Sequence, residues 1–187
     1  MGLPEQHEQA LAATGRLVDG VKPDQMDDPT PCDGWNVREL LNHIVSGNFW
    51  VGELVGGRTI EEVGDKYDGD VVGTDPAGAY RDSALVAGPA FKEPGAMERP
   101  VAVSYGPVPG EVYAGHRLID VLVHGWDLAK GTGQDTTLDP DLVAACWAVV
   151  EPQLAELSGS GAFGTTVEVA PDASLQTRLL AALGRQG

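Results

Sequence analysis

The most informative stretch of the chain is EVYAGHRLIDVLVHGWDLAKG, residues 111–131. Its apolar side chains recur three or four positions apart, as they do on one face of an α-helix. The residues of this apolar stripe are Leu118, Ile119, Leu122, Trp126 and Ala129. The pattern predicts an amphipathic helix from about Pro109 to Lys130 that ends at Gly131 and packs against other helices.

A row of ionisable side chains lies beside that stripe. His116, Asp120 and His124 are spaced four residues apart, so neighbours in the row share one face of the helix. Asp120 and His124 can therefore bind one metal ion together, or they can form an ordinary i,i+4 charge pair. His116 lies one turn before Asp120 and cannot easily reach the same ion. We expect it to line a pocket or to contact a metal ligand from behind.

A third metal ligand has to come from another element. His43 lies in RELLNHIVSGNFW, residues 38–50, at the edge of an apolar stripe. Gly47 follows one turn later and leaves space beside His43 for a second helix or a ligand. Two histidines and one carboxylate form an open site that suits zinc, nickel or iron(II). His43 can instead be a hydrogen-bonded residue of the core or its boundary.

Three further helices are predicted to complete a bundle. The first spans residues 3–21, and the third opens at an Asp-Pro step and spans residues 76–91. The second begins after Asn36, which forms a capping box with Glu39, and runs to about residue 55. The connections are rich in Gly, Pro and Asp, which interrupt helices. The plain interpretation is a mostly antiparallel helical bundle.

The other segments are shorter or less regular. No internal repeat or domain linker is evident, so we predict one domain over residues 1–187. The predicted segments are an extended stretch at 99–110, a fifth helix at 140–157, a turn (SGSGAFGTT) at 158–166, an extended piece (VEVA) at 167–170 and a last helix at 175–183.

Composition excludes several classes of partner. The chain is 42% hydrophobic and 21% charged, which is typical of a globular protein. Its formal net charge of -16 repels phosphate backbones and anionic lipid, so we expect neither nucleic acid nor a membrane surface as a partner. The N-terminus lacks the basic and apolar regions of a signal peptide, so we expect a cytoplasmic protein.

Two cysteines and one more histidine need an interpretation. Cys32 and Cys146 are expected to stay reduced in the cytoplasm. Cys32 precedes a helix N-terminus, where the helix dipole favours a thiolate, although a bystander role is the simpler interpretation. Cys146 lies in the apolar run VAACWAVV and is expected in the core. His7 lies between Glu5 and Glu8 and is expected on the surface.

Two long motifs carry a family resemblance. They are TPCDGWNVRELLNHIVSGN (30–48) and GHRLIDVLVHGWDLAKGTG (115–133). They resemble the actinobacterial metal-binding family related to the N-terminal domain of mycothiol-dependent maleylpyruvate isomerase, in the DinB/YfiT-like superfamily. The segments GAFGTTVEV (161–169) and SLQTRLLAALGR (174–185) extend the resemblance over nearly the whole chain.

The resemblance implies an all-α fold, a DinB-like four-helix bundle of up-down-down-up type with a short, partly extended C-terminal tail. It implies a metal ion at one end of the bundle, held by His43, Asp120 and His124. Many superfamily members have His at the position of Asp120, and the isomerase has Glu there. Asp120 keeps the carboxylate but shortens its reach by one methylene. The isomerase also carries a separate C-terminal domain, for which this chain is too short, so maleylpyruvate is not the expected substrate.

Three functions remain open from the sequence. The first is a mycothiol-dependent transferase or isomerase that acts on a small electrophile and uses a divalent metal, zinc before nickel or iron. In that enzyme His116 or Asp127 would orient a ligand or relay a proton, and Trp50 and Trp126 would wall the pocket, although the core is the simpler place for both. The second is a non-catalytic metal-binding or stress-response module, which can be a homodimer. The third is a metal-dependent hydrolase. No catalytic residue is assigned.

Overall fold

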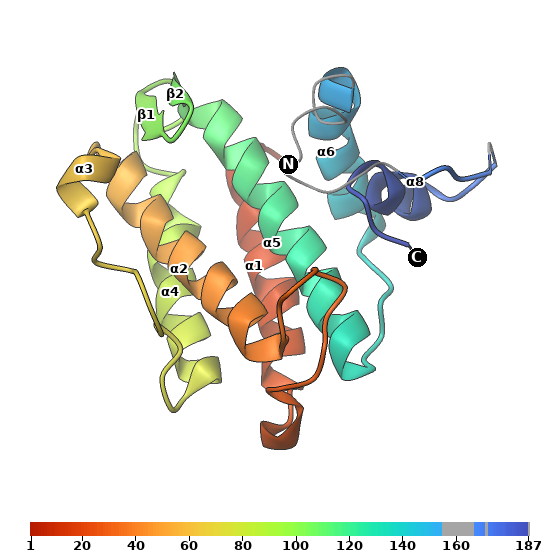
Figure 1. Ribbon diagram of the computed structural model, residues 1–187. Helices are drawn as coiled ribbons and strands as arrows, with labels where there is room; N and C mark the ends of the chain where they lie inside the picture. The colour runs from red at the N-terminus through yellow and green to blue at the C-terminus, as the bar shows by residue number, and fades with distance from the viewer. Residues whose placement is uncertain (155–166, 171, 187) are drawn as a thin grey trace. The chain divides into compact units, whose positions relative to one another are not determined.

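The computed structural model describes residues 1–154, 167–170 and 172–186 (Figure 1). Contacts group the chain into two compact units, Met1–Thr136 and Thr137–Gly187. Each unit is described by itself below, and one domain over the whole chain stays a prediction. In the described part of the chain, no helix has the length and apolar character needed to cross a bilayer.

The first unit is a four-helix bundle. Its helices are α1 (Leu3–Asp19), α2 (Val37–Val55), α4 (Pro76–Ala90) and α5 (Gly110–Thr132). Helix α1 packs against α4 and α5, and α2 packs against the same two helices (Figure 1). The predicted all-α bundle is therefore confirmed, with each of its four helices close to the predicted bounds.

Capping explains where α2 begins. The Asn36 side chain accepts a hydrogen bond from the Glu39 backbone N–H at 2.9 Å, and the Glu39 carboxylate accepts one from the Asn36 N–H at 2.9 Å. This reciprocal pair satisfies two backbone donors that the first turn leaves open. The predicted capping box is confirmed, and it fixes the position of the helix that carries His43.

The predicted end of α5 was wrong by two residues. Gly131 is still helical, and the left-handed residue that ends the helix is Gly133, with φ of +69°. A glycine at position 131 has a different role, because a Cβ there would lie 3.1 Å from the Pro29 carbonyl oxygen. Its glycine lets the loop before α2 approach α5 closely, and that loop also carries Cys32.

The expectation for His7 was also wrong. His7 is fully buried, and its ring meets Phe91 edge-on at a centroid distance of 5.1 Å. It shares the inner face of α1 with apolar residues one and three turns further on, which are Ala10, Leu11 and Val18. The core-facing stripe of α1 thus starts one turn earlier than its apolar residues indicate.

Short elements connect the bundle helices. A 3₁₀ turn, Pro23–Gln25, follows α1, and the irregular stretch after α2 contains a short helix, α3 (Ile60–Val63), that the sequence did not predict. The extended stretch before α5 is a hairpin of β1 (Pro100–Val103) and β2 (Gly106–Pro109), which pair antiparallel.

The second unit contains helix α6 (Pro140–Val150), the 3₁₀ turn η2 (Glu151–Gln153) and helix α8 (Leu175–Ala182), and α6 packs against α8. Cys146 is fully buried, as expected. Residues 167–170 form no regular strand. The end of the predicted fifth helix beyond residue 154 and the predicted turn at 158–166 lie outside the described residues.

Candidate metal centre

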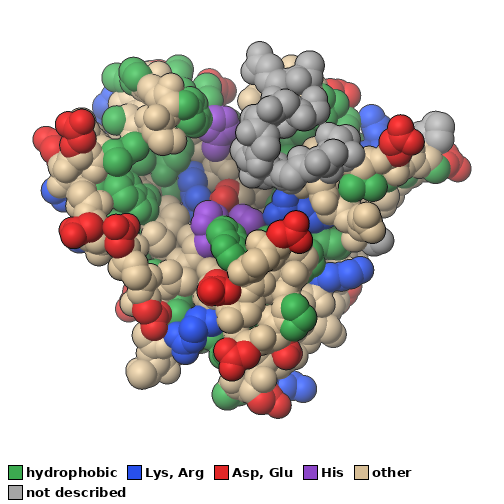
Figure 2. Space-filling view, viewed as in Figure 1, with side chains coloured by type: hydrophobic (Ala, Val, Ile, Leu, Met, Phe, Trp, Pro, Cys, Tyr) green, Lys and Arg blue, Asp and Glu red, His purple; other side chains and the backbone are tan. Residues whose placement is uncertain are grey.

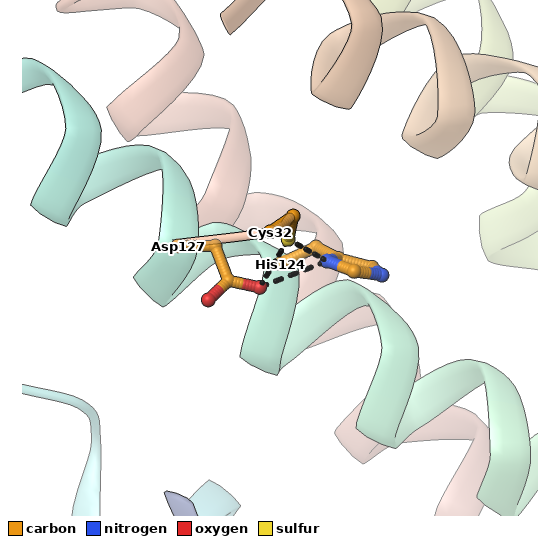
Figure 3. A group of neighbouring side chains, drawn as sticks. All are labelled: Cys32, His124 and Asp127. Atoms are coloured by element: carbon orange, nitrogen blue, oxygen red, sulfur yellow. Dashed lines mark hydrogen bonds and ion pairs between the residues drawn. The ribbon is translucent and has the colours of Figure 1, made fainter. Parts of the chain in front are cut away.

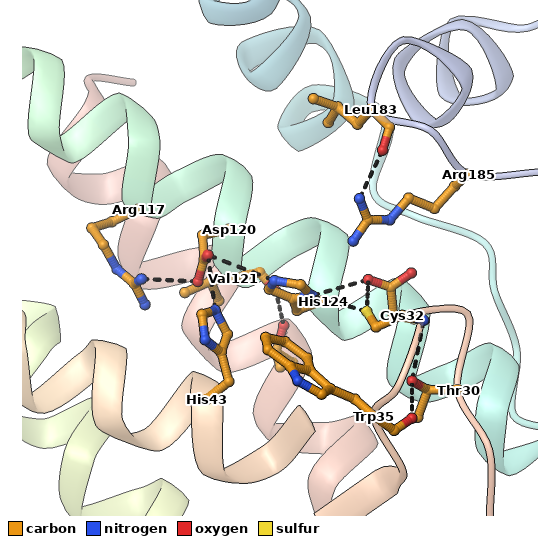
Figure 4. Close-up of polar contacts among 12 residues, drawn as sticks. Thr30, Cys32, Trp35, His43, Arg117, Asp120, Val121, His124, Leu183 and Arg185 are labelled. Carbon is orange, nitrogen blue, oxygen red and sulfur yellow. Dashed lines mark hydrogen bonds and ion pairs between the residues drawn. The ribbon is translucent and has the colours of Figure 1, made fainter. Parts of the chain in front are cut away.

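Three predicted ligands from two helices lie together. His43 comes from α2, and Asp120 and His124 come from adjacent turns of α5 (Figure 4). The Asp120 Oδ1 atom lies 3.2 Å from His43 Nε2 and 3.7 Å from His124 Nε2. All three donor atoms lie within 4.8 Å of one another. These spacings match those between ligands around one divalent ion, because metal–ligand bonds of about 2.0–2.2 Å place donors roughly 3–4 Å apart.

A close helix approach at Gly47 supports this geometry. A Cβ at Gly47 would lie 2.7 Å from the Arg117 Nη1 atom, so at this position α2 has no side chain between its backbone and the guanidinium of α5. The expected space beside His43 therefore exists, and Arg117 occupies part of it. Any larger residue at position 47 would push Arg117 away from Asp120 and its neighbours.

Arg117 is the main electrostatic partner of Asp120. Its Nη1 atom lies 2.8 Å from Asp120 Oδ2, and its Nη2 atom donates to Asn48 Oδ1 at 3.3 Å. Burial alone would raise the pKa of Asp120, but the charges of Arg117, His124 and His43 outweigh burial and lower it well below its ordinary value. Asp120 is thus held as a carboxylate, with one oxygen toward Arg117 and the other toward both histidines.

The far side of the His124 ring contacts two more side chains (Figure 3). His124 Nδ1 lies 3.0 Å from Asp127 Oδ2, and the Cys32 Sγ atom donates to that same oxygen at 3.2 Å. Cys32 Sγ also lies 3.7 Å from His124 Nδ1. Asp127 is completely buried, and these contacts help to compensate for the loss of water around its carboxylate. In the tautomer whose Nδ1 donates its proton to Asp127, the Nε2 lone pair faces His43 and Asp120.

The loop before α2 supplies Cys32, whose role the sequence did not reveal. The Thr30 hydroxyl accepts the Cys32 backbone N–H at 3.2 Å and donates to the Trp35 carbonyl at 2.8 Å. This tight turn directs the thiol toward α5 (Figure 4). Trp35 covers the site, with its ring 4.8 Å from that of His43. Only the TPC turn before a capped helix could have pointed to this arrangement.

The other candidate residues lie in different places. His116 contacts the Tyr105 hydroxyl through Nδ1 at 2.7 Å, and burial lowers its pKa, so it is neutral near pH 7. It belongs neither to the three ligands nor to the lining of the cavity described next. Trp126 is buried and lies under the ammonium of Lys130. Trp50, by contrast, lines that cavity.

A cavity of about 690 Å³ opens beside His43. Its lining includes one face of α2, Trp35, and residues 67–70 of the segment that follows α3. His43 is about a third exposed, and histidine side chains are visible near the middle of the face in Figure 2, with Asp and Glu around them. A small molecule in this cavity would reach His43 directly. The arrangement can therefore bind a divalent ion and a small ligand next to each other.

Known proteins with the same pattern identify the family. The sequence pattern of the mycothiol maleylpyruvate isomerase N-terminal domain matches residues 7–129, which include all three predicted ligands. Two uncharacterized proteins of Mycobacterium tuberculosis, from strains CDC 1551 and H37Rv, are each 40% identical over 151 residues, covering 79% of this chain and 79% of theirs.

Solved structures agree on the fold. A mutant of mycothiol-dependent maleylpyruvate isomerase superposes with a TM-score of 0.66 at 15% identity, over 86% of this chain and 71% of the isomerase. A second structure of that isomerase gives a TM-score of 0.62 at 16% identity, over 83% and 68%. At this identity the structures establish a shared fold, while the matched sequence pattern establishes the relationship. The chain belongs to the mycothiol maleylpyruvate isomerase N-terminal domain family.

Proposed function

We propose that the protein is a metal- and thiol-dependent transferase or isomerase for a small electrophile, with mycothiol as the thiol. His43, Asp120 and His124 would hold one divalent ion, with zinc preferred over nickel or iron(II). The supporting observation is the convergence of these three donors beside a cavity that a small molecule can enter. We expect it to act in the cytoplasm on small molecules, without nucleic acid or membrane.

Each residue has a defined part in this proposal. When bound, the ion would stabilise a coordinated sulfur as thiolate near neutral pH. Arg117 keeps Asp120 ionised and oriented, since its guanidinium lies 2.8 Å from the outer carboxylate oxygen. Asp127 accepts the Nδ1 proton of His124 and so directs Nε2 toward the ion. Trp35 and Trp50 would provide aromatic walls for a small molecule next to His43.

One observation favours a second candidate, a non-catalytic metal-binding module. Cys32, His124 and Asp127 form another group of donors within 4.8 Å of one another. An ion bound there would have a thiolate ligand and would use the opposite nitrogen of His124. A closed site of this kind is typical of structural metals, whereas the three-ligand site beside the cavity leaves positions for substrate. A hydrolase with metal-bound water would use the same three residues as the transferase.

Metal analysis followed by thiol addition tests the proposal. The purified protein should contain about one equivalent of a divalent metal. Mycothiol should raise the melting temperature of the metal-loaded protein and, with Co²⁺ as the metal, add a sulfur-to-metal charge-transfer band. His116→Ala is the matched control, because it removes a histidine of the same helix outside the site and should keep both responses. Metal without any response to mycothiol would favour the module, and absence of metal would refute both.

A further inference from the structure

The cavity beside His43 has one wall that is fixed in place. The Asn42 side chain donates to the Gly69 carbonyl at 2.7 Å and accepts the Val71 N–H at 2.7 Å. Further along α2, the Phe49 ring stacks on the Tyr67 ring at a centroid distance of 5.2 Å. These contacts hold residues 67–71 against α2. The cavity is therefore formed before any ligand binds.

Carboxylates outnumber cationic side chains in the lining. The lining contains the guanidinium of Arg38 and three carboxylates, those of Glu39, Asp68 and Asp70. The guanidinium is paired with Asp70 at 3.3 Å. A second Arg38 hydrogen bond goes to the Gly73 carbonyl at 3.0 Å. The Arg38 guanidinium is therefore already bound by groups of the protein. The cavity lining as a whole carries a net negative charge.

The neighbouring cations are engaged in the same way. Arg117, behind Gly47, is paired with Asp120 and hydrogen-bonded to Asn48. Lys66, next to the wall, is paired with Glu53. Binding of a dicarboxylate would have to break one of these pairs or leave its charges facing carboxylates, and either change weakens binding. By contrast, indole and phenol rings favour flat and cationic groups.

We infer that the ligand of this cavity is a flat organic molecule without anionic groups, either uncharged or cationic. This inference applies to the part of the ligand that lies between Trp35, Trp50 and residues 67–70. It rests on the proposed function only where that ligand is called the substrate. The binding preference itself follows from the charges and aromatic rings of the lining and requires neither metal nor turnover.

Three probes of one shape test this inference: benzamidine (cationic), benzamide (uncharged) and benzoate (anionic). They are titrated into the full-length protein after treatment with a chelator, and the indole N–H signals of Trp35 and Trp50 are followed by NMR. Benzamidine should bind about tenfold more tightly than benzoate, with benzamide between them. Because the metal is absent, benzoate cannot gain affinity by ligation, and failure of the metal proposal would leave this order unchanged.

Two charge-reversal variants test whether the preference for benzamidine comes from the cavity lining. Asp68→Lys changes a wall residue, whereas Asp65→Lys makes the same change three residues earlier, outside the lining. Asp68→Lys should reduce the benzamidine preference about tenfold, and Asp65→Lys should change it less than about twofold. The inference is overturned if benzoate binds most tightly to the unmodified protein, if both variants act equally, or if no probe shifts either indole signal.

Discussion

The bundle contains two buried histidines in opposite situations. His124 is surrounded by partners, with Asp127 and Cys32 on one side and Asp120 on the other. His7 is fully buried, and neither of its nitrogens has a hydrogen-bond partner among the described residues. Burial lowers the pKa of His7 to about 3, aided by the charge of Arg117, so it stays neutral. The two residues differ in the partners that orient the ring, and we therefore propose a ligand role for His124 and none for His7.

The largest effect is expected when the partnered histidine is removed. His124→Ala deletes one of the three proposed ligands, so stoichiometric metal should be lost. Elemental analysis after dialysis checks this, with His7→Leu as the control that removes a buried histidine outside the site. Full metal content in the His124→Ala protein would refute the ligand assignment.

A smaller loss of metal affinity is expected when Asp127, the hydrogen-bond partner of His124, is replaced and His124 is kept. Asp127→Asn keeps the side-chain shape but gives His124 Nδ1 a weaker acceptor than a buried carboxylate. Metal affinity should fall about 10- to 100-fold. Competition with a chromophoric chelator measures the affinity, and ¹⁵N shifts of His124 in the metal-free protein report which ring nitrogen carries the proton. Unchanged affinity together with an unchanged tautomer would contradict the positioning role.

The unpartnered histidine should affect acid stability. Between pH 6.5 and about 3 the unfolded chain binds a proton at His7 that the folded chain does not. The stability is therefore complete above pH 6.5 and falls with decreasing pH, by up to about 1.4 kcal/mol per pH unit from this group. His7→Leu and His7→Gln should both remove that slope in urea unfolding experiments. A slope identical to that of the unmodified protein would show that other groups cause it.

The smallest change is expected at Cys32. Cys32→Ser preserves a donor toward Asp127, so metal affinity should change less than about threefold if Cys32 only supports the carboxylate. The same chelator competition measures it. A loss as large as that of Asp127→Asn would instead indicate a thiolate ligand and would favour the module described above.

The sequence predicted what depends on local pattern. Helical periodicity and the Asn36 cap gave the four bundle helices, and the spacing of Asp120 and His124 put both on one face. The contact between Cys32 and His124 could not be predicted from the sequence, because it depends on the conformation of a loop that lies 92 residues from His124 in the chain. His7 was misjudged because its flanking glutamates indicate solvent, whereas its helical face is decided by packing.

The ionisable residues of α5 have one more consequence. Arg117, Asp120, His124 and Asp127 are separated by three, four and three residues, which is the a and d spacing of a heptad. Coiled-coil bundles have leucine or isoleucine at these positions, whereas this helix has ionisable side chains there. Replacing one member removes a polar partner from its neighbours, whereas replacing all four by apolar residues of similar volume should give a leucine-type seam. The fourfold variant should therefore be at least as stable as the unmodified protein and should lack the proposed metal centre.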